Sequence, residues 1–231
     1  MEGQPEIVPV LEAHRLDEAR LAEYLKEQGL LDGALKVRQF QGGQSNPTYL
    51  LQSGDREYVL RKKPPGKVLP SAHQVDREYR VMKALGEHSD VPVPAMHVLC
   101  EDDAVIGTSF YVMDFVPGRV FTQPQLEALP KDQRAGLYND KIDTLAKLHS
   151  VDYQAAGLGD FGKPKGYVER QVKRWSAQYE ASKTDEMPAM DNLMVWLADN
   201  IPQDDSAAIA HGDFRLGNLL VDNRTPDVVA V

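Results

Sequence analysis

The residues best suited to chemistry lie near the end of the chain, in the segment HGDFRLGN at positions 211–218. Asp213 supplies a carboxylate, and Asn218 supplies a neutral amide oxygen five positions later. A carboxylate beside a hydroxyl can take up its proton, and an amide oxygen is a hard ligand that suits Mg²⁺. A loop of fixed length would hold both groups on one side of a cleft. The alternative is structural: a Gly-Asp turn and an Asn turn that cap two strands.

The spacing of these two residues matches the protein-kinase catalytic loop, H-R-D-x-x-x-x-N. The fuller pattern, H-G-D-x-x-x-G-N, resembles the signature of the aminoglycoside phosphotransferase family, which includes choline kinase relatives and domains associated with acyl-CoA dehydrogenases. The resemblance runs from about Phe40 to the end of the chain. It implies a protein-kinase-like fold of two lobes and the ATP-dependent phosphorylation of a small-molecule hydroxyl. In that scheme Asp213 is the base and Asn218 binds Mg²⁺.

Two more polar residues belong to this loop. Arg215 lies where many protein kinases carry a lysine that contacts phosphate. It would then neutralise charge on the transferring phosphoryl group, or else pair with a surface carboxylate. We interpret His211 as a residue that orients the loop by hydrogen bonding, because the aspartate is better placed to act as the base.

A turn rich in small residues, FQGGQSNPTYLL, lies between two predicted strands. Gly42 and Gly43 let the backbone approach phosphates, and Ser45 and Asn46 offer further donors. The segment is neither a G-x-G-x-x-G loop nor a Walker A sequence. Taken alone it is typical of an ordinary hairpin turn, so its value comes from its place just before the strand REYVLRK.

The strand REYVLRK has a basic end that resembles the V-A-I-K strand of kinases. Side-chain alternation places Val59 and Arg61 on one face and Lys62 on the other. Val59 would line the adenine pocket and Arg61 would meet the phosphates. Arginine departs from the lysine of the kinase pattern, yet it binds phosphate in a bidentate way. The alternative is a solvated basic strand end.

The helix DREYRVMKAL supplies Glu78, which matches the helix glutamate that pairs with the strand cation in kinases. We therefore predict an ion pair between Arg61 and Glu78. The positions three and four residues away on the helix carry no cation: Gln74, Val75, Val81 and Met82. An unpaired, solvated glutamate is the remaining alternative.

The segment FYVMDFVPG resembles the passage between kinase lobes. Met113 would lie at the back of the adenine pocket. The backbone C=O of Asp114 and the N–H of Val116 would face the adenine edge. The alternative is an ordinary buried strand that ends in a Pro-Gly turn.

Hydrophobic patterns predict an α+β fold that positions these residues. Residues 1–116 form a nucleotide-binding lobe, with a leading helix and a five-stranded antiparallel sheet that carries one helix. Residues 117–231 form a partial, mainly helical lobe with the catalytic loop. Three helices are expected at about 131–150, 166–182 and 191–200, and three short strands at AAIA, NLLV and VVAV. In the first of these helices the apolar stripe contains Leu137 or Tyr138, then Ile142, Leu145 and Leu148.

The composition narrows the partners and the location. The net charge of −9 over 231 residues disfavours a nucleic-acid partner, because phosphate backbones are met by basic patches. The single cysteine, Cys100, excludes an intrachain disulfide and is typical of a reducing compartment. No signal peptide or membrane span is seen, so we expect a cytoplasmic protein without a membrane partner. The oligomeric state is left open.

Kinases hold a second metal ligand, the aspartate of D-F-G, one short strand beyond the asparagine. Here the strand VVAV ends at Val231, and the nearby Asp222 and Asp227 are misplaced for that role. We therefore expect a truncated chain. The alternative function is a catalytically incomplete, pseudokinase-like module that binds nucleotide. The acceptor is open between an antibiotic, an amino alcohol and a hydroxyacyl thioester, although VLRKKPPG and HGDFRLGN look most like the acyl-CoA-dehydrogenase-associated group.

Overall fold

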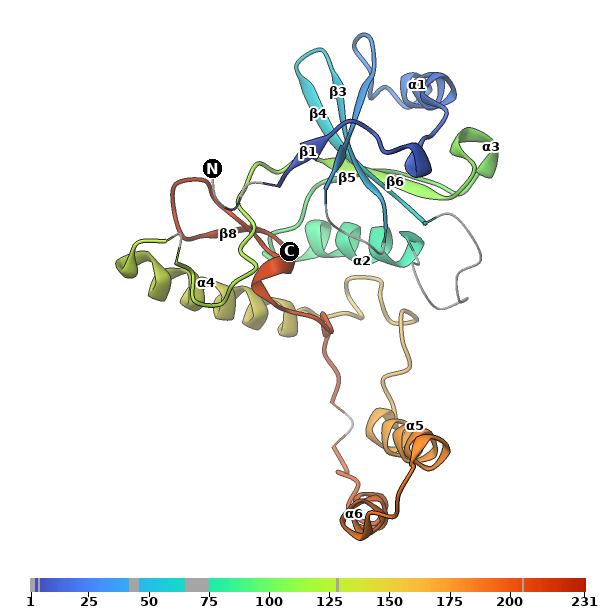
Figure 1. Ribbon diagram of the computed structural model, residues 1–231, viewed down its shortest axis with the longest axis vertical. Coiled ribbons are helices and arrows are strands. Elements are labelled where there is room, and N and C mark those ends of the chain that lie inside the picture. Colours follow the sequence, from blue (N-terminus) through green and yellow to red (C-terminus); the bar gives the residue numbers. More distant parts are fainter. Residues whose placement is uncertain (1–2, 4, 42–45, 65–74, 128, 205) are drawn as a thin grey trace. The chain divides into compact units, whose positions relative to one another are not determined.

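A computed structural model describes the chain except for residues 1–2, 4, 42–45, 65–74, 128 and 205 (Figure 1). The chain divides into two compact units. The first contains residues 1–151 and 210–231, and the second contains residues 152–209. Both sides of the predicted lobe boundary at residue 116 contribute to the first unit, so that boundary stays a prediction.

Within the described residues, the first unit contains a six-stranded antiparallel sheet of order β1-β2-β3-β4-β6-β5. The strands are β1 (Ile7–Val8), β2 (Lys36–Phe40), β3 (Thr48–Ser53), β4 (Arg56–Lys62), β5 (Met96–Cys100) and β6 (Phe110–Asp114). All five predicted strands are present, but the predicted number is wrong by one. The extra strand, β1, has two residues, which are too few to show an alternating pattern.

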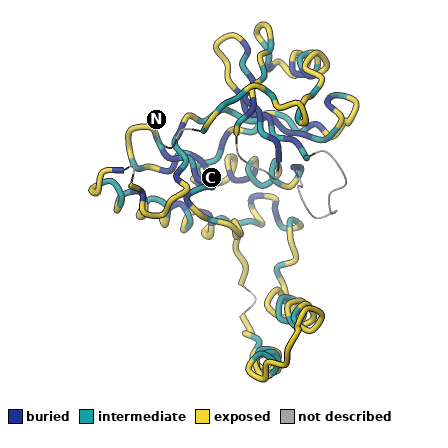
Figure 2. The backbone as a smooth tube through the Cα atoms, viewed as in Figure 1, coloured by how far each residue is buried: buried dark blue, intermediate teal, exposed yellow. Residues whose placement is uncertain are grey.

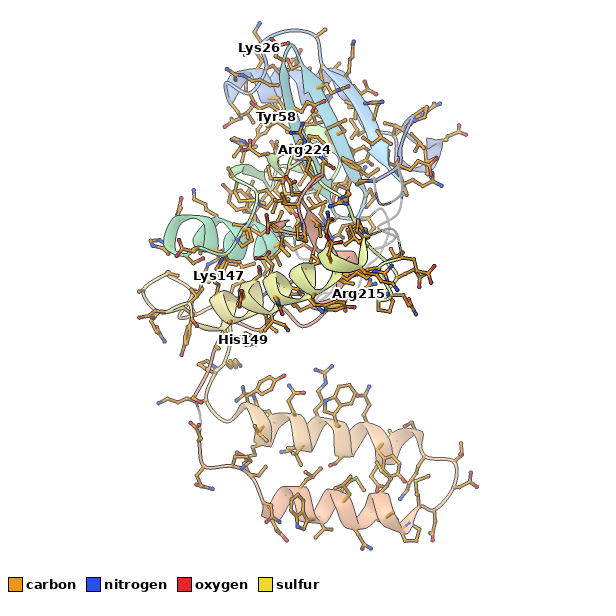
Figure 3. All side chains as sticks on the ribbon, turned by 90° about the vertical axis from the view of Figure 1, so that its left-hand side faces the viewer. Lys26, Tyr58, Lys147, His149, Arg215 and Arg224 are labelled. Atoms are coloured by element: carbon orange, nitrogen blue, oxygen red, sulfur yellow. The ribbon has the colours of Figure 1, made fainter. Side chains whose placement is uncertain are left out.

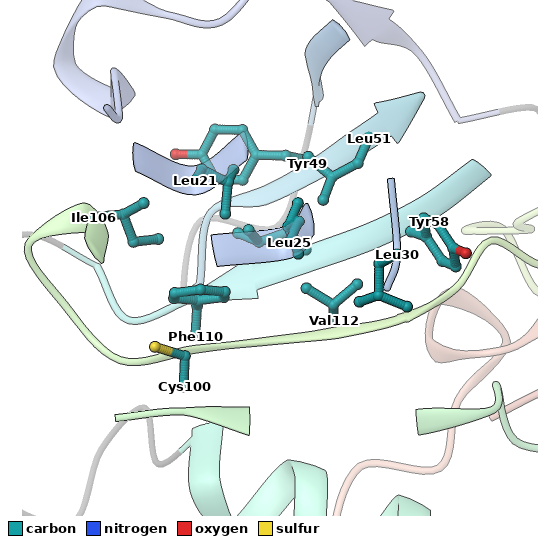
Figure 4. Packing of buried hydrophobic residues seen from close by; sticks show 11 residues of the cluster. Leu21, Leu25, Leu30, Tyr49, Leu51, Tyr58, Cys100, Ile106, Phe110 and Val112 are labelled. Carbon is teal, nitrogen blue, oxygen red and sulfur yellow. The ribbon is translucent and has the colours of Figure 1, made fainter. Parts of the chain in front are cut away.

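One face of this sheet packs on helix α1 (Glu18–Glu27) and forms the larger core (Figure 4). Asp17 caps the N-terminus of helix α1, because its carboxylate accepts a hydrogen bond from the Arg20 N–H. Leu21 and Leu25 are fully buried, which stabilises the fold by about 1.5–3 kcal/mol for each side chain. The strand residues of this face in the cluster are Tyr49, Leu51, Tyr58, Leu60, Cys100, Phe110 and Val112.

The opposite face carries the residues of functional interest. The pairing of β3, β4 and β6 places Leu50, Val59 and Met113 next to one another. Further along the same two strands, Arg61 of β4 pairs with Tyr111 of β6, so both lie on this face as well. Helix α2 (Val75–His88) packs against β5 and β6. A short helix, α3 (Asp103–Ile106), lies in the connection between β5 and β6 and contacts α1.

The rest of the first unit is built on α4 (Lys131–His149) and the hairpin of β7 (Leu220–Val221) and β8 (Val228–Ala230). Leu137 and Leu148 of α4 are buried, but Tyr138 and Ile142 are 37% and 57% exposed. The prediction of a buried Ile142 is therefore wrong. Helix α4 carries two adjacent apolar stripes, and the sequence pattern does not distinguish between them. The predicted strand AAIA is also wrong, because residues 207–210 form no strand.

The second unit contains two helices that pack on each other, α5 (Tyr167–Ser182) and α6 (Pro188–Asp199). Both were predicted, and α6 begins three residues earlier than expected. Pro188 occupies its first turn, where a backbone N–H would make no hydrogen bond within the helix, so proline is tolerated there. Neither helix contains a buried residue, as the yellow and teal colours of Figure 2 show. Their large exposed side chains include Trp175 and Trp196.

Candidate active site

The loop at 211–218 folds around the carboxylate of Asp213. A 3-10 turn at Leu216–Asn218 brings the Asn218 side chain back toward it. Asn218 Nδ2 donates to the backbone oxygen of Asp213 and to its Oδ2, both at 2.9 Å. Arg215 Nε donates to the same Oδ2 at 3.1 Å. Three residues that the sequence singled out therefore lie together.

The two oxygens of the Asp213 carboxylate have different surroundings. Oδ2 accepts from Arg215 and Asn218, whereas Oδ1 has no hydrogen bond within the described part of the chain. The hydrogen bonds from Arg215 and then from Asn218 hold the pKa of Asp213 below its usual range. The carboxylate is therefore ionised at neutral pH, with Oδ1 open to a hydroxyl.

Arg215 pairs with a carboxylate, as one of the two alternatives proposed, and the partner is Asp213 itself. The two side chains are 63% and 62% exposed. The Arg215 side chain is labelled in Figure 3. An ion pair this exposed contributes about 0–1 kcal/mol to stability. The guanidinium would therefore lose little stability on leaving this carboxylate.

His211 supports the backbone of the loop. Gly212 has φ +87°, which favours glycine, and the next N–H, that of Asp213, donates to His211 Nδ1 at 3.2 Å. Loss of hydration around the ring lowers the pKa of His211. A neutral imidazole that accepts a backbone N–H agrees with the orienting role that the sequence indicated.

The predicted ion pair between Arg61 and Glu78 is confirmed, with 3.3 Å between Nε and Oε2. Both side chains are about a third exposed. Arg61 Nε is buried and makes no hydrogen bond to any residue that the structure describes, so its contact with Glu78 is an ion pair rather than a directed hydrogen bond. Lys62 lies on the other face, with Nζ 5.6 Å from the centre of the Tyr49 ring, as alternation predicted.

Glu78 has two further partners. Asn46 Nδ2 donates to Oε1 at 3.1 Å, and the Tyr111 hydroxyl donates to Oε2 at 3.0 Å. Asn46 was predicted as a phosphate donor, a role that stays a prediction. Tyr111 was not predicted at all, although a hydroxyl within a buried strand does require a partner. The other residues predicted for the phosphate turn lie outside the described residues: Gly42, Gly43 and Ser45.

The residues predicted to bind adenine follow the same face and its edge. Val59 is buried and pairs with Met113, so both belong to one apolar surface. The Asp114 carboxylate pairs with His97 Nε2 at 2.6 Å. The N–H of Val116 makes no hydrogen bond in the described part of the chain. The binding of adenine by these residues stays a prediction.

A family model described as the phosphotransferase enzyme family matches residues 36–231. The chain belongs to this family. Mouse acyl-CoA dehydrogenase family member 10 is 43% identical over 233 residues, which cover 99% of this chain and 22% of the mouse protein. A crystal structure from Ralstonia eutropha, assigned as an aminoglycoside phosphotransferase, is 44% identical with a TM-score of 0.82. It covers 94% of this chain, which spans 64% of that protein.

The likeness of this chain to a more distant structure shows the fold alone. That structure is a thermostable mutant of an aminoglycoside phosphotransferase in a ternary complex with ADP and hygromycin B, 17% identical with a TM-score of 0.54. That match covers 91% of this chain and 68% of the other. The protein-kinase-like fold and the resemblance to aminoglycoside phosphotransferases are confirmed, including the link to acyl-CoA dehydrogenase family members.

The loop residues of this family member fit one side of a Mg²⁺ site. Asn218 turns its amide nitrogen toward Asp213, which leaves the Asn218 Oδ1 without a hydrogen bond in the described structure. Hard oxygen ligands of this kind are those that Mg²⁺ prefers. The described residues hold no group of three or more histidine, cysteine or carboxylate side chains that could bind a metal. Asn218 would therefore share the ion with phosphate oxygens and water.

The two aspartates near the end of the chain have structural tasks. Asp222 accepts from the N–H groups of Arg224 and Thr225, and this closes the β7–β8 turn. Asp227 accepts from the Thr225 hydroxyl at 2.6 Å. That neither aspartate is the second metal ligand stays a prediction. No helix in the described residues has both the length and the apolar character to cross a membrane.

Proposed function

We propose that this protein transfers the γ-phosphoryl group of ATP to a hydroxyl of a small molecule. The observation that carries the proposal is the open Oδ1 of Asp213 beside Asn218, in a loop of kinase spacing. A carboxylate held in place on one oxygen and free on the other suits a base that must meet an incoming hydroxyl. Family membership supports phosphoryl transfer as the reaction class.

In the proposed reaction, Asp213 Oδ1 orients the acceptor hydroxyl and accepts its proton. The acceptor oxygen forms a bond to the γ-phosphorus as the bond from that phosphorus to the bridging β–γ oxygen breaks, and ADP leaves. Arg215 moves from Asp213 to the transferring group and offsets its charge. Asn218 would hold Mg²⁺, which would supply positive charge beside the phosphates. Most of the acceleration then comes from positioning.

The nucleotide would lie on the α2 face of the sheet. Arg61, paired with Glu78, contacts the phosphates together with the turn at Gly42, Gly43, Ser45 and Asn46. Val59 and Met113 cover the adenine ring. The C=O of Asp114 and the N–H of Val116 bind its edge. These assignments rest on the pairing of β4 with β6 and on the Arg61–Glu78 contact.

The acceptor is the finer part of the proposal. Curated relatives carry acyl-CoA dehydrogenase in their names, which makes hydroxyacyl thioesters the first class to test. Amino alcohols and aminoglycosides are the other two. A solved relative at 44% identity is assigned as an aminoglycoside phosphotransferase, so the third class belongs in the same assay.

The decisive experiment compares the protein with its Asp213→Ala variant. ATP consumption is measured against a panel of the three acceptor classes, and nucleotide affinity is measured by calorimetry. We expect the variant to lose transfer, by about 10²–10⁴-fold, and to keep its nucleotide affinity. An active variant refutes the role of Asp213. Nucleotide binding without turnover by the unaltered protein would instead favour a pseudokinase-like module.

A further inference from the structure

We propose that Tyr111 is a positioning residue for the nucleotide phosphates, which acts through Glu78 on Arg61. The inference rests on the proposed function, because it assigns a task within the same nucleotide site. It concerns a residue on β6 that the kinase pattern does not include. Three contacts of one carboxylate support it.

The Glu78 carboxylate is the junction of three elements. Its Oε2 accepts from the Tyr111 hydroxyl of β6 at 3.0 Å and lies 3.3 Å from Arg61 Nε of β4. Its Oε1 accepts from Asn46 Nδ2 at 3.1 Å. Tyr111 and Arg61 therefore share a single oxygen. Because they are also paired residues of adjacent strands, both approach Glu78 from the same face.

The contacts of Arg61 and Tyr111 with Glu78 differ in rigidity. Arg61 forms an ion pair with Glu78 in which its Nε makes no hydrogen bond to a described residue, and both side chains are about a third exposed. Tyr111 is 1% exposed and belongs to a central strand, so its hydroxyl has a fixed place. A buried aromatic ring with two rotatable bonds loses little freedom on making this bond. Tyr111 thus sets the Glu78 rotamer, and Glu78 sets where the guanidinium lies.

The hydroxyl is a permanent donor in this position. Burial raises the pKa of Tyr111 above its ordinary value, and the nearby negative charge of Glu78 adds to the shift. Tyr111 therefore donates to Glu78 throughout the physiological pH range. Asn46 restrains the second carboxylate oxygen of Glu78.

A purely structural role would make Tyr111 equivalent to any other buried tyrosine. The chain contains a matched case in Tyr49, which is 0% exposed on the other face of the sheet. Its hydroxyl donates to the backbone oxygen of His14 at 2.7 Å and therefore does not bind Glu78. Tyr111→Phe and Tyr49→Phe each remove one buried hydroxyl bond and leave the ring.

The test uses the full chain, with thermal unfolding and calorimetric binding of a non-hydrolysable ATP analogue and of adenosine. Both variants should lower the unfolding midpoint. Only Tyr111→Phe should weaken the binding of the ATP analogue, by about 5–10-fold, while the affinity for adenosine stays unchanged. Adenosine has no phosphates and therefore does not depend on Arg61. Equal losses for both ligands, or an equal effect of Tyr49→Phe, would overturn the inference.

A second variant series tests whether the effect passes through Arg61. With Arg61→Met as the background, adding Tyr111→Phe should cause no further loss of affinity for the ATP analogue, since coupled residues are not additive. Multiplicative losses would show that Tyr111 acts on its own and contradict the inference. If the unaltered protein binds no nucleotide, the proposed function fails as well. If it binds and Tyr111→Phe binds equally well, only this inference fails.

Discussion

At the residue scale, the chemistry depends on how single side chains divide their contacts. Asp213 uses Oδ2 to brace the loop and keeps Oδ1 free of hydrogen bonds within the described structure. The bracing lowers the pKa of its carboxyl, which makes it a weaker base but keeps it ionised. In the proposed reaction a weak base is sufficient, because catalysis of phosphoryl transfer depends mainly on positioning and electrostatic stabilisation.

Arg215 offers a test of charge at the transferring group. Arg215→Gln removes the guanidinium, and we expect kcat to fall about 10–100-fold because phosphoryl charge is no longer offset. The unfolding midpoint should fall by no more than about 4 °C, because an exposed pair adds about 0–1 kcal/mol. Steady-state rates and thermal unfolding check both parts. A large drop in stability with unchanged kcat would assign Arg215 to folding instead.

Lys62 gives a prediction about pH. Its side chain is 5% exposed over the Tyr49 ring, with no carboxylate partner in the described residues, and burial lowers its pKa from 10.5. Below the folded-state pKa, Lys62 is protonated, and burial of its charge lowers the stability of the folded state. Between that pKa and the ordinary value the unfolded chain binds the extra proton, so stability rises with pH.

Lys62→Met removes the buried charge, and we expect a gain of about 1 kcal/mol at pH 7, net of the lost ring contact. The gain should shrink as the pH approaches 10. Urea unfolding at both pH values measures it. Lys83→Met is the control, because Lys83 is about half exposed and pairs with Glu87 on α2. A Lys62→Met variant that is less stable at pH 7 would contradict the expectation.

The sequence could predict the Arg61–Glu78 pair because strand alternation and the absence of a helix partner left few choices. It could not predict Tyr111 as part of the same cluster. In the apolar run FYVMD a tyrosine has the features of a core residue, and only the three-dimensional pairing of β4 with β6 brings its hydroxyl to the glutamate.

At the element scale, the β7–β8 hairpin is held by the segment that follows β6. Arg119 and Val221 exchange backbone hydrogen bonds at 2.7 and 2.9 Å. Arg119 also donates to the backbone oxygens of Asp222 and Thr225. This clamp fixes the strand that directly follows Asn218. The loop at 211–218 thus depends on a contact about a hundred residues away in the sequence.

Gly118 is the tightest point of this clamp. A Cβ there would lie 3.0 Å from the Val221 oxygen and 3.2 Å from the Leu220 Cβ. We expect Gly118→Ala to destabilise the fold by about 1–3 kcal/mol, because backbone must move to make room. Gly33→Ala is the matched control, since its nearest neighbour is a Gly54 nitrogen at 3.9 Å. Chemical unfolding measures the stability of both variants. Equal stabilities would refute the proposal that the close approach at Gly118 matters for the fold.

The misjudged elements share one physical cause: their local pattern is weak. The two residues of β1 add to the sheet only because β2 offers a free edge. The segment AAIA has the composition of a strand but has no strand partner. In α4, Leu137 and Tyr138 begin neighbouring stripes, and tertiary packing selects the one that includes Thr144 and Leu148.

At the scale of the whole molecule, the two units differ in how much they bury. The first has two apolar clusters. In the second, α5 and α6 have no buried residue, and Trp175 and Trp196 are 60% and 58% exposed. Few buried contacts mean a low free energy of local opening.

Hydrogen exchange measures this difference directly. We expect amides in α5 and α6 to exchange at least tenfold faster than those in β4 and β6, because local opening of the helices breaks few apolar contacts. Mass spectrometry of peptides from both regions provides the comparison within one sample. Protection of α5 equal to that of β4 would show that the second unit is stabilised by contacts beyond those within it.

The arginine at position 61 also determines which reagents can mark this site. Acyl-phosphate derivatives of nucleotides label kinases by transferring an acyl group to an amine near the phosphates. Arg61 is a guanidinium that stays protonated and is no nucleophile, and Lys62 lies buried on the far side of the sheet. Strand β4 therefore offers such probes no reactive amine. A probe that relies on an amine at position 61 would find none to acylate there.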